Sequence, residues 1–148
     1  MHEFKDELED LSFQILNPSA YSSLMTRIEY LKKDKSNLTD KIKTRIFSLL
    51  EKNEINCQII GREKKIFSVW NKMQNKQIAF RQLSDIFAYR IITESIEDCY
   101  SILGIIHNRW SAVPGSFKDY ISTPKINNYQ SVHTTIVGPE RQRVELQI

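Results

Sequence analysis

The sequence is poor in cysteine, glycine and proline, and these shortages exclude several kinds of protein. It has two cysteines, four glycines and four prolines in 148 residues. Cys57 and Cys99 stand far apart, which excludes a disulfide-stapled scaffold and gives no metal-finger or redox spacing. Free thiols in a reducing compartment are the simplest interpretation, so we expect a cytoplasmic protein.

Long apolar runs and a strong excess of one charge are also missing. No run approaches the roughly eighteen apolar residues that cross a bilayer, and the first residues are acidic, unlike a secretory leader. The 21 basic and 18 acidic residues leave a net charge of +3, too little to favour duplex nucleic acid on electrostatic grounds. We therefore expect no membrane partner and no nucleic-acid partner; RNA binding through the basic long helix over 21–49 rests on charge alone and ranks last among the functions considered. The remaining composition, 41% hydrophobic and 26% charged, is typical of one compact domain.

The apolar spacing predicts an α/β or α+β domain in which helices flank a mixed sheet of about five strands. Residues 8–15 should form a short helix that ends before Asn17-Pro18. A long helix should follow over 21–49, with Lys35 interrupting its apolar stripe. Further helices are expected over 64–75 and 96–110, the second starting at a capping box that opens with Ser95.

Alternating or β-branched runs predict the strands, which we expect over 55–59, 86–93, 117–122, 131–137 and 143–148. The last two should form a hairpin around Gly138-Pro139, with Val144, Leu146 and Ile148 facing one side and Glu145 and Gln147 the other. The run at 86–93 reads as a central strand. Such a strand would bury Arg90, which would then need a partner.

One polar stretch, residues 115–135, has few core-forming side chains and indicates a ligand site. Lys118 and Lys125 can hold phosphate charge, and Tyr129 offers a flat face for stacking. Side chains that can bond the polar edges of a base complete the set: Asn127, Asn128, Gln130 and His133. Together they predict a nucleotide. The alternative is an ordinary surface loop that leads into a hairpin, with Tyr129 packed on the sheet.

Two weaker patterns accompany this stretch. Lys64, Ser68 and Lys72 recur every four residues and so share one helical stripe, just after Arg62. That stripe and its helix start could bind a polyphosphate, although a solvated lysine face is the commoner outcome. Asp85 and Glu145 could share Mg²⁺ with substrate phosphates. The alternatives are a cap or an ion-pair partner for Asp85 and a solvated carboxylate for Glu145.

Several motifs in register carry a resemblance to a known family. They read GREKKIFSVWNK (61–72), DIFAYRI (85–91), DCY (98–100), PGSFKDYI (114–121), PKINNYQSVHTT (124–135) and VELQI (144–148). With their order and spacing, they resemble the synthetase domain of RelA/SpoT-type alarmone enzymes, from about Leu8 onward and without the hydrolase and C-terminal regulatory domains. The resemblance implies a connector helix over 1–17 and a nucleotidyltransferase-like domain over 18–148. That domain would transfer pyrophosphate from ATP to the 3′-hydroxyl of GDP or GTP, making the (p)ppGpp of the stringent response.

The resemblance also implies a role for each candidate residue. ATP would be bound by Arg62, Lys64, Ser68 and Lys72. The catalytic residues would be Asp85, Glu145 and Lys118, with Asp85 holding Mg²⁺ and Glu145 lying by the metal and the acceptor hydroxyl. Guanine would stack on Tyr129, and the rest of GDP or GTP would be held by Lys125, Asn127, Gln130 and His133.

Three departures from the family pattern qualify the activity that we expect. Ser116 replaces the arginine of the usual Arg-Phe-Lys-Asp loop, and serine cannot supply that charge. Asn128 replaces a glycine, and asparagine is the mildest substitute if the backbone there needs a positive φ. Family members continue past Ile148, so we expect a shortened domain with an unsupported final strand. The alternative function is a degenerate synthetase that binds guanine nucleotide, a partner protein or a second copy with little turnover.

Overall fold

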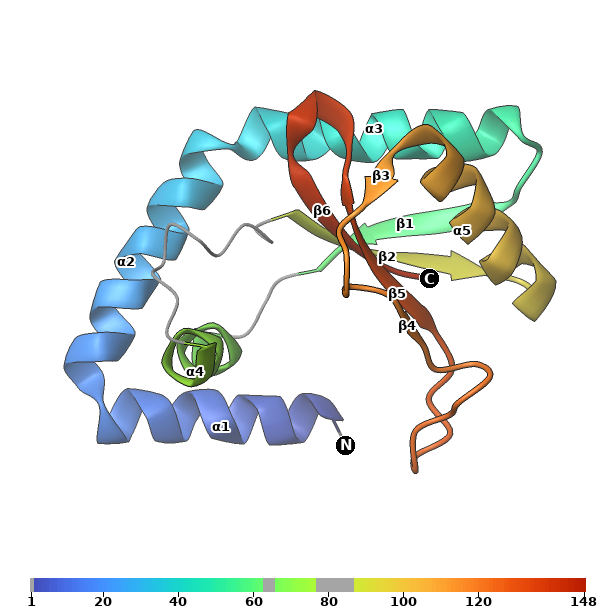
Figure 1. The fold of residues 1–148 in the computed structure, drawn as a ribbon. Coiled ribbons are helices and arrows are strands. Elements are labelled where there is room, and N and C mark those ends of the chain that lie inside the picture. The colour runs from blue at the N-terminus through green and yellow to red at the C-terminus, as the bar shows by residue number, and fades with distance from the viewer. Residues whose placement is uncertain (1, 63–65, 77–86) are drawn as a thin grey trace. The chain divides into compact units, whose positions relative to one another are not determined.

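A computed structural model describes residues 2–62, 66–76 and 87–148 (Figure 1). The chain divides into two compact units, Met1–Asn37 with Glu63–Leu83 and Leu38–Arg62 with Ser84–Ile148. Each unit has a hydrophobic cluster of its own. No helix in the described part of the chain is both long and apolar enough to cross a membrane.

The first unit is built from helices around one aromatic side chain, Phe13. Its described helices are α1 (His2–Leu16), α2 (Pro18–Asp34) and α4 (Ile66–Lys76). The Phe13 ring lies 6.0 Å from Tyr21, 5.9 Å from Phe67 and 5.4 Å from Trp70, measured between ring centroids. The apolar side of α4 therefore faces the cluster, as its sequence spacing predicts.

The long helix expected over 21–49 is wrong, because the chain forms two helices there. The first, α2, ends at Asp34, and α3 begins at Ser36 and runs to Lys52. Lys35 caps α2 with a non-helical backbone (φ −107°, ψ 13°), and its N–H donates to the carbonyl of Leu31 at 3.0 Å. The interruption of the apolar stripe at Lys35 marks this break.

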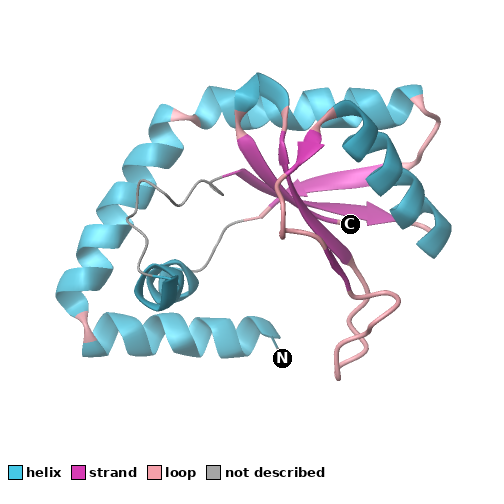
Figure 2. Ribbon diagram, in the orientation of Figure 1, coloured by secondary structure: helices cyan, strands magenta, loops and turns pink. Residues whose placement is uncertain are grey.

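The second unit holds a mixed sheet, shown with its helices in Figure 2. Within the described residues it has six strands: β1 (Cys57–Gly61), β2 (Phe87–Thr93), β3 (Ser111–Ala112), β4 (Lys118–Asp119), β5 (Val132–Val137) and β6 (Arg143–Gln147). Their order is β1-β2-β6-β5-β3, with β4 also paired to β5. Only β2 and β6 pair in parallel among these strands. The mixed α/β fold that the sequence predicts is thus confirmed.

Helices α3 and α5 (Ile96–Arg109) cover one face of this sheet. The Tyr89 hydroxyl of β2 donates to the backbone carbonyl of Thr39 in α3 at 2.7 Å. The His107 ring of α5 bonds the Thr134 hydroxyl of β5 at 2.8 Å. Buried aliphatic residues of the strands and both helices fill the space between. The capping box at the start of α5 is confirmed, since Ser95 Oγ accepts the N–H of Asp98 at 3.1 Å.

Three local expectations are wrong. Arg90 is exposed, because β2 alternates and sends every second side chain to the face away from the helices. The strand expected over 117–122 is only Lys118–Asp119, because the Asp119 side chain accepts the amides of Ile121 and Ser122 and turns the chain. The end of β6 is supported: Ile148 is 5% exposed and exchanges backbone hydrogen bonds with Val132 at 2.9 and 3.1 Å.

Candidate functional site

The candidate site lies on the sheet face that points away from α3 and α5, which we call the site face. Strand register aligns polar side chains on it in two adjacent rows. The first row crosses the sheet as Lys118, His133, Gln147 and Arg90. The second is Thr135, Glu145 and Ala88. Paired residues on neighbouring strands point to the same face, so residues 118, 133 and 145, far apart in sequence, share one surface.

An ion pair joins two of the predicted site residues. Arg62 follows β1, and its backbone N–H donates to the carbonyl of Ala88 at 2.7 Å. Its guanidinium Nη1 lies 3.2 Å from Glu145 Oε1, with the two side chains 37% and 20% exposed. A partly exposed pair of this kind contributes only about 0.2–1 kcal/mol to stability. Its importance is therefore that it holds a cation and a carboxylate together on the site face.

Aromatic side chains gather beside this pair. We name Tyr120, Lys125, Tyr129 and His133 the Tyr-His cluster. The rings of Tyr120 and Tyr129 lie 5.0 and 5.8 Å from that of His133, and Tyr129 Oη lies 3.0 Å from His133 Nε2. Lys125 Nζ sits 4.4 Å from the centre of the Tyr120 ring and 5.2 Å from that of Tyr129. The stacking residue and the lysine expected at a nucleotide site are thus together.

The charge of His133 is set by its surroundings. Burial is the main cause that lowers its pKa, to about 4, and the cations Lys125, Arg62 and Lys118 lower it further. The Glu145 carboxylate opposes them. At neutral pH the imidazole is therefore uncharged, so it can both donate and accept a hydrogen bond. These influences also place Arg62, Lys118, Lys125 and Glu145 within electrostatic reach of one side chain.

The loop before Tyr129 is shaped by two asparagines. Asn127 Oδ1 accepts the N–H of Tyr129 at 3.2 Å, and the N–H of Asn128 donates to the carbonyl of Lys125 at 3.0 Å. Asn128 has φ 60°, so the condition under which asparagine is the mildest substitute for glycine is met. Asn127 thus supports the turn that presents Tyr129. Gln130, which follows, is exposed.

Ser116 stands where family members usually have an arginine, and here its side chain bonds the backbone of a loop. Its hydroxyl donates to the carbonyl of Val113 at 2.6 Å and accepts the N–H of Thr135 at 3.1 Å. The side chain thereby links Val113, just after β3, to Thr135 of β5, next to the residues that pair in the β3–β5 ladder. Position 116 is neutral and turned to the backbone, so Lys118 is the cation that this loop supplies to the site face.

The remaining predicted ATP and metal residues lie in the other unit or outside the described residues. Lys64 and Asp85 lie outside the described residues. Ser68 and Lys72 lie on α4 in the other unit, where the N–H of Phe67 donates to Asp10 Oδ1 at 3.0 Å. The start of α4 thus has an acidic cap from its own unit. The ATP roles of Lys64, Ser68 and Lys72 and the metal role of Asp85 stay predictions.

Sequence reasoning assigns no role to three residues of this site. Arg90 and Gln147 share the first row with His133, and Tyr120 packs against its ring. Arg90 could have been found from the alternation of side chains between the two faces of the strand 87–93. The mostly apolar composition of that run makes the alternation hard to recognise in the sequence. Gln147 is expected on the polar side of its strand, yet it is only 5% exposed between neighbouring strands.

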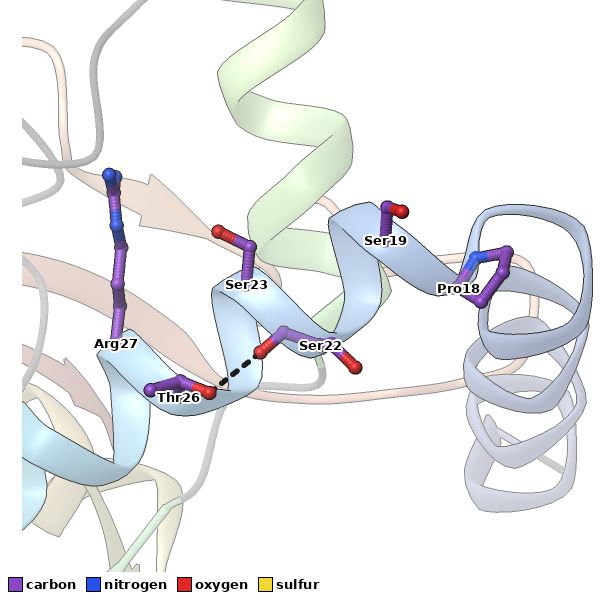
Figure 3. A pocket seen from close by; sticks show the side chains of 6 residues that line it. All are labelled: Pro18, Ser19, Ser22, Ser23, Thr26 and Arg27. Carbon is purple, nitrogen blue, oxygen red and sulfur yellow. Dashed lines mark hydrogen bonds between the residues drawn. The ribbon is translucent and has the colours of Figure 1, made fainter.

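A shallow hollow occurs elsewhere, on the surface of α2 (Figure 3). It is lined by Pro18, Ser19, Ser22, Ser23, Thr26 and Arg27. The Thr26 hydroxyl donates to the carbonyl of Ser22 at 2.9 Å, a local bond within the helix (Figure 3). Within the described residues, all of the lining comes from one helix, and it includes neither a carboxylate nor an aromatic ring. We assign no chemistry to this hollow.

Comparisons with known proteins show the family of this chain. The family model described as "Region found in RelA / SpoT proteins" matches residues 61–148. The GTP pyrophosphokinase rsh of Brucella melitensis is 49% identical over 148 residues, which are 100% of this chain and 20% of that protein. The chain thus spans about a fifth of the length of such relatives.

Solved structures give the same relationship. Small alarmone synthetase 2 from Bacillus subtilis superposes with a TM-score of 0.63 at 26% identity, covering 81% of this chain and 70% of that one. Small alarmone synthetase 1, in a structure bound to its product pppGpp, has a TM-score of 0.61 at 22% identity, covering 83% and 72%. The second match, at lower identity, supports the fold alone. By the family model, which matches more than half of its residues, the chain belongs to the RelA/SpoT family.

Proposed function

We propose that this chain transfers a pyrophosphoryl group from ATP to the 3′-hydroxyl of GDP or GTP, making (p)ppGpp. The observation that carries the proposal is the convergence of Arg62, Lys118 and Glu145 on the site face beside the Tyr-His cluster. Phosphoryl chemistry depends on positioning and charge neutralisation, which cations and a carboxylate supply. A stacking platform beside them suits a base-bearing acceptor.

The Tyr-His cluster is the proposed acceptor site. Tyr129 would stack on guanine, and Lys125, already above its ring, would hold phosphate charge. The neutral His133 would bond the acceptor nucleotide through the nitrogen that Tyr129 does not use. Asn127 and Gln130 flank the base position. The pppGpp named with small alarmone synthetase 1 supports a guanine nucleotide here.

The donor would lie toward Arg62 and the exposed Arg90. Arg62 and Lys118 would neutralise the charge that develops on the transferred group, and Ser68, Lys72 and Lys64 would bind the rest of ATP. Arg62 now bonds Glu145, so we infer that donor phosphates draw the guanidinium away and free Glu145 Oε1. Glu145 would then orient the 3′-hydroxyl and accept its proton as the new O–P bond to the β-phosphorus forms, the α–β phosphoanhydride of ATP breaks and AMP leaves.

We further propose that Mg²⁺ takes part. Glu145 supplies the hard oxygen ligand that this ion prefers, and Asp85 is the proposed second carboxylate. An ion of this kind is usually held by one or two carboxylates together with the substrate phosphates. When bound, Mg²⁺ supplies electrostatic stabilisation of phosphate charge. Free cysteines and cytosolic nucleotide substrates agree with a cytoplasmic location.

The test is incubation of the chain with labelled ATP, GDP or GTP and Mg²⁺, followed by separation of the nucleotides. We expect a guanosine product with a 3′-pyrophosphate, and its loss in Glu145→Gln. Glu94→Gln, which changes an exposed carboxylate after β2, is the matched control and should keep activity. Nucleotide binding with no product in any variant would instead support a degenerate synthetase that binds without turnover.

A further inference from the structure

Helix α5 bonds the site-bearing strands at two points on one of its sides. Tyr100 in its first turns donates its hydroxyl to Asp119 Oδ2 at 3.0 Å, and His107 bonds the hydroxyl of Thr134 at 2.8 Å. Residues seven apart lie on the same side of a helix. The helix therefore contacts both β4 and β5 through polar side chains. The Tyr100 contact is made with β4, the strand that carries Lys118.

Asp119 is the centre of a turn within that segment. Its Oδ1 accepts the N–H groups of Ile121 at 2.9 Å and Ser122 at 3.0 Å, and its Oδ2 accepts the Tyr100 hydroxyl; the Ser122 hydroxyl also bonds this carboxylate. The Ser122 amide is the main cause that lowers the pKa of Asp119 to about 2. The carboxylate is therefore charged at every working pH. A charged acceptor forms stronger hydrogen bonds than a neutral one, which suits a fixed connection.

The neighbours of Asp119 on either side belong to the candidate site. Lys118 lies opposite His133 in the strand register, and the Tyr120 ring contacts His133 at 5.0 Å and Lys125 Nζ at 4.4 Å. The turn that Asp119 organises thus sets where both side chains lie. Any rotation of the Asp119 carboxylate changes the backbone that presents them, and Tyr100 limits that rotation.

We propose that Tyr100 is a positioning residue for the acceptor site: its hydroxyl fixes the Asp119 carboxylate and, through the turn, the placement of Lys118 and Tyr120. This role deepens the proposed function and rests on it. Tyr100 is 39% exposed, so its hydroxyl does little for the core. Its loss should affect the acceptor nucleotide more than the donor, because Tyr120 belongs to the Tyr-His cluster and the Tyr100 hydroxyl bonds Asp119 and not Arg62 or Arg90.

The test measures GDP and a non-hydrolysable ATP analogue by calorimetry in the wild type, Tyr100→Phe and Tyr30→Phe. Tyr30, 70% exposed on α2, is the matched control for removal of a tyrosine hydroxyl. We expect Tyr100→Phe to weaken GDP binding three- to tenfold and to weaken binding of the ATP analogue less, since Lys118 also serves the transferred group. Amide exchange at Ile121 and Ser122 should become at least threefold faster. Asp119→Asn, which keeps an acceptor for both amides, should weaken GDP similarly, and the double variant should be no worse.

The outcomes separate this inference from the proposed function. GDP binding that is equal in the wild type and Tyr100→Phe, with unchanged amide exchange, would overturn the role of Tyr100 alone. So would additive losses in the double variant, since they would show that the two residues act separately. A wild-type chain that binds no guanine nucleotide would overturn the proposed function itself. If Tyr100→Phe does not fold, as judged by circular dichroism, Asp119→Asn supplies the same comparison.

Discussion

Acid should destabilise this protein through His133, and the size of the effect follows from the surroundings of the imidazole. Its pKa falls from 6.5 to about 4 on folding, chiefly through burial. The unfolded chain therefore binds the proton more readily, so stability is full above pH 6.5 and falls as the pH drops toward 4. Between pH 7 and 4.5 the full effect would be about 2.4 kcal/mol, and about 1–2 kcal/mol after allowance for partial exposure.

The assay is urea unfolding at pH 7 and pH 4.5 for the wild type and His133→Gln. The variant should lose stability at pH 7, because its side chain lacks the ring contacts with Tyr120 and Tyr129. Between the two pH values, however, it should lose about 1–2 kcal/mol less than the wild type. His107→Gln is the control: burial also lowers the pKa of His107, but without a contribution from nearby cations. Parallel pH profiles for the wild type and His133→Gln would refute the reasoning.

Substitutions at three further positions test the site. Tyr129→Ala should weaken GDP by about 1–3 kcal/mol in calorimetry, the range for a lost base stack, while Tyr30→Ala should not; equal affinities would remove the stacking role. Asn128→Gly should keep thermal stability within a few tenths of a kcal/mol, whereas Asn128→Ala should cost about 1 kcal/mol because φ is positive; the reverse order would contradict the turn geometry. Ser116→Arg should raise transfer at least tenfold, about 1.4 kcal/mol in barrier, despite about 1–2 kcal/mol of lost stability; a folded, nucleotide-binding variant without product would place the defect elsewhere.

The sequence predicts the parts of this fold that local chemistry decides. The Ser95 cap, the apolar side of α4 and the alternation in β6 all follow from spacing within a few residues. In the sequence, the break at Lys35 is indicated only by the interruption of the apolar stripe, because helix propensity alone permits a continuous helix there. The early end of β4 depends on how the Asp119 side chain bonds, which no periodicity reveals.

The site is predictable in its residue types but not in its contacts. Lysines, an aromatic ring and amides within 115–135 indicate a nucleotide through the chemistry of their side chains alone. That Arg62 bonds Glu145 depends on the order of strands far apart in the chain. The same order brings Arg90 and Gln147 into line with His133. Register across a sheet is a non-local property, so single-sequence reasoning could not supply these pairs.

The position of β6 at the middle of the sheet has a consequence for folding during synthesis. Its ladder with β2 joins Phe87 to Val144, and its ladder with β5 completes the link to β3 and β4. During synthesis, β1 and β2 must wait for a much later segment before they meet the other half of the sheet. Arg62 belongs to the early half, and Lys118 and His133 to the late one. Pairing of one short segment, Arg143–Gln147, with both halves of the sheet is therefore required before Arg62, Lys118 and His133 lie on one surface.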